Sequence, residues 1–396
     1  MSLPLAGIRI VTVEQYGAGP FGSMYLADLG AEVIKIENPH TGGDVARGSG
    51  PFFLGEGDSQ FFQTFNRNKQ SLSLDLKQAE GRAVFERLVG SAHAVLNNLR
   101  GDQPEKLGLT YAALRHLNPA LVCAHLSAYG RDNERSTWPG YDYLMQAEAG
   151  YMHLTGEPDG PPTRMGLSMV DYMTGVTTAL ALTAGLVGAL RDGQGRDVDV
   201  SLFDVALHQL TYPATWYLNG GHETQRMPAS AHPSTVPCQT FASSDGWVFV
   251  MCMTEKFWQL LLAELDTPAL SDDARFATVA ERARHREPLL ALLGEQFRRR
   301  STTEWMAALA GKLPIAPVCA LGEALDNPYL ERVGMLQHTP HPQAPQMRVL
   351  SNPIKLDGQR LAGKVCPPLG ADSDALLAGL GYGQADIAGL RARGVL

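Results

Sequence analysis

The stretch GIRIVTVEQYGAGPFGSMYLADLGAEVIKIE, residues 7–37, decides the fold. Its first part, residues 7–13, is rich in β-branched side chains and predicts a strand. Residues 20–29 predict a helix that Gly30 ends, because glycine readily takes the left-handed conformation found after helices. Residues 31–37 predict a second strand. A strand, a helix and a strand within about 30 residues indicate a right-handed βαβ unit, and hence a parallel sheet.

The alternation of strands and helices continues beyond this unit. Further strands are predicted at residues 72–76, 93–99 and 121–130, and helices at residues 79–92 and 111–117. This order is typical of a doubly wound α/β layer. Residues 1–222 are therefore predicted to form the first part of a large Rossmann-like domain with a parallel sheet.

The pattern changes after residue 222. QTFASSDGWVFVMC, residues 239–252, predicts a β-hairpin with Asp245 and Gly246 in its turn. Helices are predicted at residues 255–265, 286–300 and 302–311. We interpret residues 223–325 as a smaller α+β domain. The Pro-rich stretch and helical tail of residues 326–396 are predicted to return to the large domain and complete it.

Composition narrows the class of function. The chain has 396 residues, and 33 Lys and Arg against 41 Asp and Glu give a net charge of -8. An acidic chain without basic runs is not expected to bind nucleic acid or an anionic membrane. The five cysteines are scattered and form no CxxC, which favours a reducing cytoplasm over a disulfide framework. The 11 histidines show no HExxH spacing, so no metal site is predicted.

Residues 172–190 form one apolar run, YMTGVTTALALTAGLVGAL. At this length the run could just cross a bilayer. It contains several threonines and glycines, and no second apolar run accompanies it. We interpret it as a tightly packed interior helix, because a helix that is apolar on all sides belongs in a core.

The residues Gly17 to Gly22, GAGPFG, fit the GxGxxG pattern between a strand and a helix. Glu37 ends the next strand, where a dinucleotide-binding fold places an acid for the ribose. Pro20 has no N–H to offer a pyrophosphate, however. The residues alone leave three interpretations open: a capped glycine turn, a nicotinamide or flavin site, or a site for another ligand.

Asp171 follows Ser168 at the start of the apolar run, in a capping-box pattern. It is either a structural residue of the first helical turn or a reactive carboxylate. The helix dipole would keep such a carboxylate ionised, and nearby N–H groups could stabilise an oxyanion. The aromatic stretch from Trp138 to Tyr143 is either a loop tip or the lining of a site.

Longer stretches resemble the class III CoA-transferase family, which includes formyl-CoA transferase and the carnitine CoA-transferases. The resemblance runs nearly end to end. It depends on the stretches PLAGIRIVTVEQYGAGPFGSMYLADLGAEVIKIENP, FNRNKQSLSLDLKQAEGR, GYDYLMQAEAG, PTRMGLSMVDYMTG and GALRDGQGRDVDVSLFDVAL.

The resemblance implies a large Rossmann-like domain, a smaller middle domain and an interlocked homodimer. It implies that Asp171 is the catalytic nucleophile and that Tyr141 and Asp142 face the acyl group. It implies contacts with coenzyme A at Gln15, Tyr16, Ala18, Leu74, Asp75, Leu76, Lys77, Asn98 and Lys106. Coenzyme A then enters as part of the acyl-CoA substrate, and no tightly bound cofactor is expected.

Some positions depart from the formyl-CoA transferase pattern. Gly17 replaces a glutamine, Asn38 replaces an arginine and Lys106 replaces an arginine. The glycine-rich loop of that enzyme's small domain has no counterpart. These departures indicate a substrate pair other than formyl-CoA and oxalate, and we expect small dicarboxylates such as succinate or glutarate.

The implied reaction moves CoA from an acyl-CoA donor to a carboxylic acid through aspartyl-anhydride and aspartyl-CoA intermediates. An α-methylacyl-CoA racemase on the same fold is the alternative. Racemase relatives place histidine in a GHD motif, where this chain has Gly140, Tyr141 and Asp142. Tyrosine, with a pKa of about 10, is a poor base at neutral pH, so the transferase is favoured. A nicotinamide-dependent dehydrogenase would depend on the GAGPFG turn and Glu37 alone.

Overall fold

The computed structural model describes residues 2–265 and 267–396, which divide into two compact units. Unit 1 comprises Met1–Ala149, Gly166–Leu210 and Pro328–Leu396, and unit 2 comprises Gly150–Met165 and Thr211–Asn327. These bounds differ from the predicted ones, because residues 150–165, 211–222 and 326–327 belong to unit 2. The guanidinium of Arg226 joins the two segments by donating to the main-chain carbonyls of Met152, His153, Glu157, Gly160 and Pro161.

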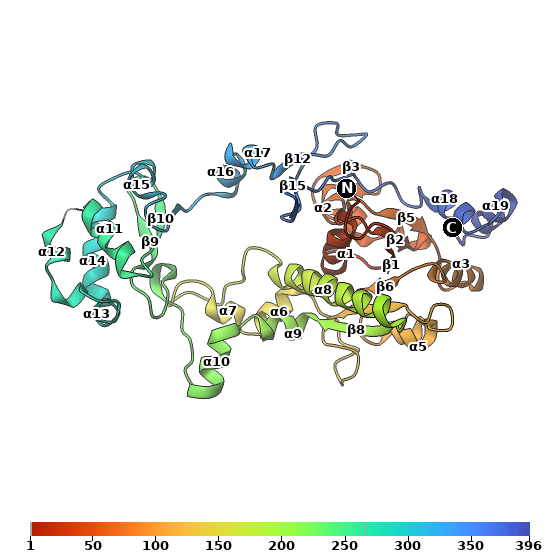
Figure 1. The fold of residues 1–396 in the computed structure, drawn as a ribbon, viewed down its shortest axis with the longest axis horizontal. Coiled ribbons are helices and arrows are strands. Elements are labelled where there is room, and N and C mark those ends of the chain that lie inside the picture. Colours follow the sequence, from red (N-terminus) through yellow and green to blue (C-terminus); the bar gives the residue numbers. More distant parts are fainter. Residues whose placement is uncertain (1, 266) are drawn as a thin grey trace. The chain divides into compact units, whose positions relative to one another are not determined.

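Unit 1 is built on a six-stranded sheet in which every pair of neighbouring strands is parallel, so the predicted α/β class is confirmed (Figure 1). In spatial order the strands are β5 (Gln70–Ser73), β2 (Glu32–Glu37), β1 (Arg9–Val13), β6 (Ala94–Asn97), β7 (Val122–Ser127) and β8 (Arg196–Ser201). In sequence terms this is the order 3-2-1-4-5-6 of a Rossmann fold. The direction of winding reverses between β1 and β6, and ligands of such sheets bind at the carboxyl ends of the strands beside this reversal.

Both faces of the sheet are covered. The helices of unit 1 are α1 (Ala18–Asp28), α2 (Gln60–Asn66), α3 (Ala79–Val89), α4 (Gln103–Lys106), α5 (Tyr111–Leu114), α6 (Asp142–Glu148), α8 (Met169–Asp192), α9 (Leu202–His208), α17 (Tyr329–Arg332), α18 (Ser373–Gly379) and α19 (Gln384–Ala392). Ile10 faces a core formed with α1 and α8, whereas the next residue, Val11, faces a core formed with α3. Both side chains are fully buried, so β1 is covered on both of its faces, as is usual in a parallel sheet.

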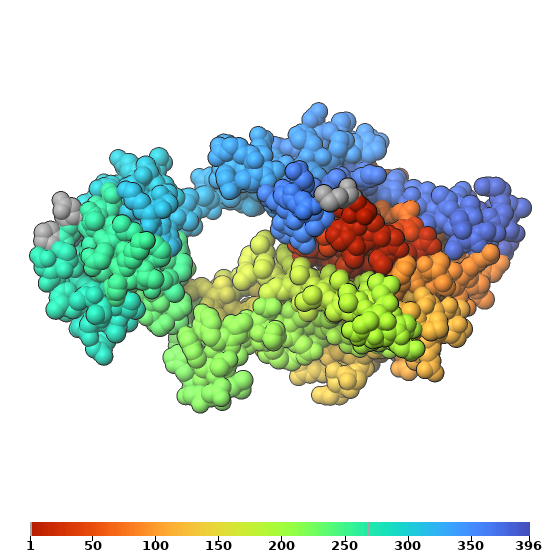
Figure 2. Space-filling view, viewed as in Figure 1, coloured from red at the N-terminus to blue at the C-terminus, as the bar shows by residue number. Residues whose placement is uncertain are grey.

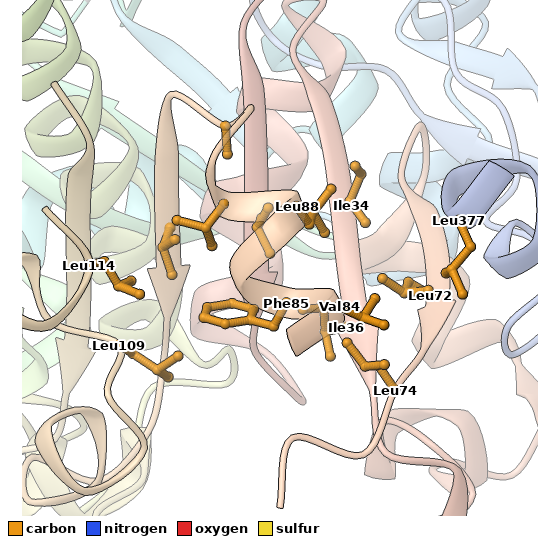
Figure 3. Close-up of a cluster of buried hydrophobic side chains, with 14 of the residues drawn as sticks. Ile34, Ile36, Leu72, Leu74, Val84, Phe85, Leu88, Leu109, Leu114 and Leu377 are labelled. Carbon is orange, nitrogen blue, oxygen red and sulfur yellow. The ribbon is translucent and has the colours of Figure 1, made fainter. Parts of the chain in front are cut away.

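The C-terminal tail belongs to the second of these cores. Leu377 of α18 lies beside Leu72 of β5 (Figure 3). Ile387 of α19 is buried in the same cluster. The tail also bonds to the edge strand β5, since the main-chain N–H of Ser73 donates to Ser373 Oγ over 3.1 Å. In Figure 2 the blue C-terminal residues lie against the orange residues that follow the first strands.

The apolar run forms α8, which extends three residues further toward the N-terminus than the run itself. Among the described residues, α8 is the one helix long and apolar enough to cross a membrane, and 50% of its most apolar stretch is buried inside the structure. Leu182 and Leu186 pack with the side chains of β6 and β7 in the core. One side of α8 therefore packs on the sheet, whereas Leu180, Val187 and Leu190 on the other side are exposed, so within this chain α8 is not the fully interior helix that we predicted.

Unit 2 contains an antiparallel sheet of β9 (Cys238–Ala242), β10 (Trp247–Met251) and β11 (Ile315–Pro317). Strands β9 and β10 form the predicted hairpin, with Ala242 paired to Trp247. Three helices follow close to their predicted positions, α11 (Glu255–Leu265), α14 (Arg286–Phe297) and α15 (Thr302–Leu309). Their buried Trp258, Phe297 and Trp305 pack with the sheet in one core.

The remaining elements are short. They are β3 (Phe53–Gly55), β4 (Asp58–Ser59), α7 (Tyr151–Leu154), α10 (Thr211–Gly220), α12 (Pro268–Ser271), α13 (Val279–Arg284), α16 (Leu321–Leu325), β12 (Leu336–His338), β13 (Arg348–Leu350), β14 (Lys355–Leu356) and β15 (Gln359–Arg360). The described residues also contain four short 3-10 helices, at Pro39–Thr41, Val45–Gly48, Pro228–Ser230 and Ala274–Phe276.

Candidate functional site

A cavity of about 210 Å³ opens at the carboxyl ends of the parallel strands, beside the reversal between β1 and β6. Its walls are the turn after β1, the segment after β6, the end of β7 and the loop before α6. The lining residues are Gln15, Tyr16, Gly17, Ala18, Asn98, Leu99, Arg100, Leu126, Ser127, Ala128, Trp138, Pro139, Gly140, Tyr141, Asp171 and Leu202. The cavity lies entirely within unit 1 and unites six of the predicted site residues, Gln15, Tyr16, Ala18, Asn98, Tyr141 and Asp171.

The turn after β1 holds Tyr16 in a left-handed conformation, with φ of 70°. Such a conformation costs a non-glycine residue free energy, and it persists only where the surroundings determine it. Here the main-chain N–H of Tyr16 donates to Asp44 Oδ1 over 2.9 Å, and Lys35 Nζ binds the other oxygen of Asp44 at 2.8 Å. The Asp44 and Lys35 side chains are fully buried, so a charged pair inside the protein fixes the backbone of the site.

Glu37 belongs to the same buried group of charges. Its four acceptor positions are used by Arg47 Nε at 2.7 Å, Arg47 Nη2 at 2.8 Å, Ser71 Oγ at 2.7 Å and the N–H of Asp44 at 3.0 Å. Burial alone would raise the pKa of Glu37, but the hydrogen bonds and charges of Arg47 and Lys35 lower it to about 2. The carboxylate therefore has no free acceptor position for the hydroxyls of a ribose. Glu37 thus no longer supports the interpretation of the turn as a dinucleotide site.

The glycines of the α1 turn allow two helices to touch. A Cβ on Gly22 would lie 2.3 Å from the carbonyl oxygen of Gly175, and a Cβ on Gly175 would lie 2.5 Å from the carbonyl oxygen of Ala18. Only glycine permits so close an approach of α1 and α8. The contact brings the start of α8 to the start of α1, where a Cβ on Gly17 would lie 3.2 Å from Asp171 Oδ2.

Asp171 is partly buried in the first turn of α8, and its carboxyl group lines the cavity. Its main-chain N–H donates to Asp142 Oδ2 over 3.0 Å. Burial, followed by the negative charge of Asp142, raises the pKa of Asp171 to about 7. We expected the helix dipole to keep this group fully ionised, but desolvation and a second carboxylate outweigh the dipole. Because Asp142 takes the N–H of Asp171, that donor is not available to an oxyanion.

Asn98 joins the two strands at the reversal. Its Oδ1 accepts the N–H of Gln15 at 2.9 Å, and its Nδ2 donates to the carbonyl of Gln15 at 2.7 Å. The Asn98 side chain thus spans the ends of β6 and β1 like an additional rung of the sheet. A Cβ on Gly19 would lie 2.7 Å from Asn98 Cβ, so the glycine turn rests on the same side chain.

Lys106 does not line the cavity, although Arg100 beside it does. Asp102 lies between the two cations, 2.5 Å from Arg100 Nε and 2.5 Å from Lys106 Nζ. The hydrogen bonds from Arg100 and Lys106 hold the pKa of Asp102 well below its usual range. Arg100 and Lys106 therefore form an exposed cationic pair around one carboxylate at the rim of the site.

The stretch Leu74 to Lys77 lies just beyond strand β5, which spans Gln70–Ser73 where we predicted 72–76. The chain leaves the sheet early because the N–H of Asp75 donates to the carbonyl of Val395 in the C-terminal tail. The Leu74 side chain is buried in the core and the Leu76 side chain packs against it. Lys77 is exposed, whereas Asp75 is buried and accepts hydrogen bonds from Lys77 N and Gln78 Nε2.

Tyr141 lines the cavity with a side chain that is 66% exposed, but Asp142 next to it points inward and is 3% exposed. Several lining residues were not predicted as site residues, among them Arg100, Ser127 and Ala128. Gly17 and Trp138 also line the cavity, and they belong to stretches for which a ligand site was one of the interpretations left open by the sequence. The signal that Arg100, Ser127 and Ala128 share is position, since Arg100 directly follows one predicted strand and Ser127 and Ala128 lie in the last part of another. Among the described residues no group of three or more His, Cys, Asp or Glu side chains is placed to hold a metal ion.

Comparison with known proteins identifies the family. Residues 5–373 match the model described as CoA-transferase family III. The chain is 33% identical to succinate–glutarate CoA-transferase of Agrobacterium fabrum, over 84% of each chain. It is 32% identical to succinyl-CoA:mesaconate CoA-transferase of Haloarcula marismortui, over 89% of this chain and 90% of that one.

A solved structure agrees. The crystal structure of a CAIB/BAIF family protein from Brucella suis superposes with a TM-score of 0.84 at 32% identity, covering 96% of this chain and 100% of that chain. None of these relatives is named as a racemase or a nicotinamide enzyme. The expected resemblance is confirmed over nearly the whole chain: the protein belongs to CoA-transferase family III, an acyl-CoA-dependent enzyme family.

Proposed function

We propose that this CoA-transferase moves CoA between two small dicarboxylic acids and that Asp171 is its nucleophile. The relatives act on succinate, glutarate and mesaconate by name, and all three acids carry two carboxylates. The observation that supports the role of Asp171 is its position, in the first turn of α8, at the cavity wall and against Gly17.

The reaction follows in four balanced steps. A carboxylate oxygen of Asp171 attacks the donor thioester carbon, and CoA leaves as thiolate, forming an aspartyl–acyl anhydride. The thiolate then attacks the aspartyl carbon and releases the donor acid, leaving an aspartyl-CoA thioester. The acceptor carboxylate displaces the thiolate to form a new anhydride. The thiolate finally attacks the acceptor carbon, which frees Asp171 and gives the new acyl-CoA without ATP.

The environment of Asp171 suits this chemistry. A carboxylate with a pKa near 7 is a stronger base than an ordinary aspartate, and its nucleophilicity toward the acyl carbon increases with its basicity. Water must be kept from both intermediates, since each would hydrolyse and waste the thioester. The Tyr141 and Trp138 rings on the cavity wall contribute apolar cover on that side.

We propose that coenzyme A lies along the carboxyl ends of the strands. The turn residues Gln15, Tyr16 and Ala18 would contact the pantetheine end, and Tyr141 the acyl group. Asn98 would act indirectly, by holding the backbone of Gln15 in place. The nucleotide end would be contacted by main-chain groups of Leu74, Asp75 and Leu76 and by the side chain of Lys77. Lys106, with Arg100, supplies positive charge for the phosphates.

We further propose a homodimer in the cytoplasm. Three apolar side chains share one face of α8 and are exposed within this chain: Leu180 at 69%, Val187 at 59% and Leu190 at 66%. Burial against a second copy would remove them from water. All five cysteines are free, as in proteins of a reducing compartment.

An isotope experiment tests the covalent role of Asp171. After turnover with succinyl-CoA and glutarate labelled with ¹⁸O in its carboxylates, one label should remain on Asp171, because the bridging oxygen of the second anhydride comes from the acceptor. Mass spectrometry of the peptide that contains Asp171 would show a gain of one ¹⁸O. Asp171→Asn should lose at least about 10³-fold in kcat while still binding CoA.

The control for this experiment is Asp204→Asn, which changes an exposed acid in the first turn of α9 of the same unit. It should retain activity and leave Asp171 labelled. Turnover by Asp171→Asn at the rate of the unaltered protein, or an unlabelled Asp171 peptide after many turnovers, would contradict the proposal.

A further inference from the structure

Asp142 is a buried carboxylate directly behind Asp171. It begins α6, is 3% exposed and accepts a hydrogen bond on each oxygen. Oδ2 accepts the main-chain N–H of Asp171 at 3.0 Å, and Oδ1 accepts Nε2 of Gln146 at 2.6 Å. The family resemblance implies that this residue faces the acyl group, but its oxygens face α8 and Gln146 instead.

The contact with Asp171 serves as the cap of α8. The first N–H groups of a helix have no partner within the helix and are usually bonded by the side chain of the N-cap residue. Ser168 is the N-cap of α8, and its side chain forms no such bond. Asp142, 29 residues earlier in the chain, provides it from another helix.

Gln146 holds Asp142 in this position. It lies one turn further along α6, is 0% exposed and donates from Nε2 both to Asp142 and, over 3.2 Å, to the carbonyl of Leu167. Leu167 directly precedes Ser168. The Asp142 and Gln146 pair therefore joins α6 to the start of α8 from two sides.

Among the described residues, no Lys, Arg or His forms an ion pair that balances the negative charge of Asp142 or of Asp171. Tyr143 on α6 and Tyr172 on α8 are also titratable groups near the pair. Burial, followed by the charges of Asp171 and Asp142, raises the pKa of Tyr172. The α1 side presents Gly17, which has no charge.

Two neighbouring carboxylates repel only while both are ionised. An acyl group on Asp171 removes its charge, so the repulsion from Asp142 is present in the free carboxylate and absent from the anhydride and the aspartyl-CoA thioester. An interaction alters the rate only where it differs between the ground state and the transition state. The negative charge of Asp171 is already partly lost in the transition state of its acylation, so the repulsion from Asp142 is partly relieved there.

We propose that Asp142, held by Gln146, is a positioning residue that caps the helix of the nucleophile and favours the uncharged, acylated form of Asp171 over the free carboxylate. This inference rests on the proposed function of Asp171. In this inference Asp142 acts on the reaction by changing the environment of Asp171, and it does not contact the substrate itself.

The test uses the full chain with ¹³Cγ-labelled aspartate. The Asp171 resonance is identified by its absence from Asp171→Asn, and its titration is followed by NMR without substrate. In Asp142→Asn the apparent pKa of Asp171 should fall by about 1 unit, and kcat should fall about 10- to 100-fold, with KM for the acyl-CoA changed less than about 3-fold. The acid limb of the kcat profile should move to lower pH by the same amount.

Two further variants separate the possible results. Gln146→Met keeps the charge of Asp142 but removes its clamp, so kcat should fall while the pKa of Asp171 stays high. Asp204→Asn is the matched control and should change neither quantity. Melting temperatures and circular dichroism of each variant establish that it is folded.

The inference is overturned if folded Asp142→Asn leaves the titration of Asp171 unmoved, whether or not kcat falls. Should Asp142→Asn not fold, Gln146→Met decides, and an unchanged kcat in that variant overturns the inference. Failure of the proposed function is seen separately, as turnover by Asp171→Asn, because the titration is read without any substrate.

Discussion

Asp171 is largely buried and lies next to a second carboxylate, that of Asp142. These two features make the stability of the protein depend on pH. Its pKa of about 7 in the folded protein exceeds the value of about 3.9 expected in the unfolded chain. Between these values the folded state binds more protons than the unfolded state, so the contribution of Asp171 to stability is lost as pH rises from about 4 to about 7. Asp171→Asn, which does not titrate, should therefore gain about 1–3 kcal/mol relative to the unaltered protein between pH 5 and pH 8.

Urea unfolding of both proteins at pH 5, 6, 7 and 8 measures this difference. Asp204→Asn serves as the control, because Asp204 is exposed to solvent, and the difference of this variant from the unaltered protein should be flat over this range. A difference between Asp171→Asn and the unaltered protein that does not change with pH would contradict the assignment.

At the scale of helices and strands, the crossing of α1 and α8 determines where the site residues lie. A methyl group at Gly175 would lie 2.5 Å from a main-chain oxygen of α1, and neither backbone can yield without moving its helix. Gly175→Ala should thus destabilise the protein by about 2–4 kcal/mol and lower kcat by displacing Asp171 from Gly17.

Gly188→Ala is the matched control on the same helix. Its new methyl group would meet only the flexible end of Arg196, at 3.4 Å or more, and alanine is the better helix former. The control should be neutral or stabilising by up to about 1 kcal/mol in thermal or urea unfolding. Equal stability of the two variants would show that the helices do not cross as closely as described.

At the scale of the whole molecule, the last residues of the chain complete a core that the first residues begin. Leu377 of α18 is fully buried among side chains of β2, β5 and α3 (Figure 3). Leu377→Ala should lower the free energy of unfolding by about 2–4 kcal/mol, since it leaves a cavity at the edge of this core. Asp374→Ala, on the same helix, removes only an exposed ion pair with Arg391 and should cost less than about 1 kcal/mol.

Urea unfolding followed by the fluorescence of the chain and by circular dichroism would compare the two variants. If Leu377→Ala were as stable as Asp374→Ala, the tail would not be part of the core of unit 1.

By itself the sequence determined the local elements of this protein and its class. Three signals depend only on the conformational preferences of neighbouring residues, and each predicted its element well. The β-branched run at residues 7–13 predicted β1, Gly30 predicted the end of α1, and the turn within residues 239–252 predicted the pair β9–β10. Resemblance along the chain identified the family, because its motifs are contiguous stretches.

The tertiary structure decided which of these elements meet and what each polar group can do there. Only the strand order places Gln15 beside Asn98, and only the glycine contact of α1 and α8 places Gly17 beside Asp171. The partners of Glu37 and the inward orientation of Asp142 could not be predicted either. The physical reason is that desolvation and charge depend on neighbours that lie tens of residues away along the chain, whereas a sequence pattern reports only the neighbours within a few residues.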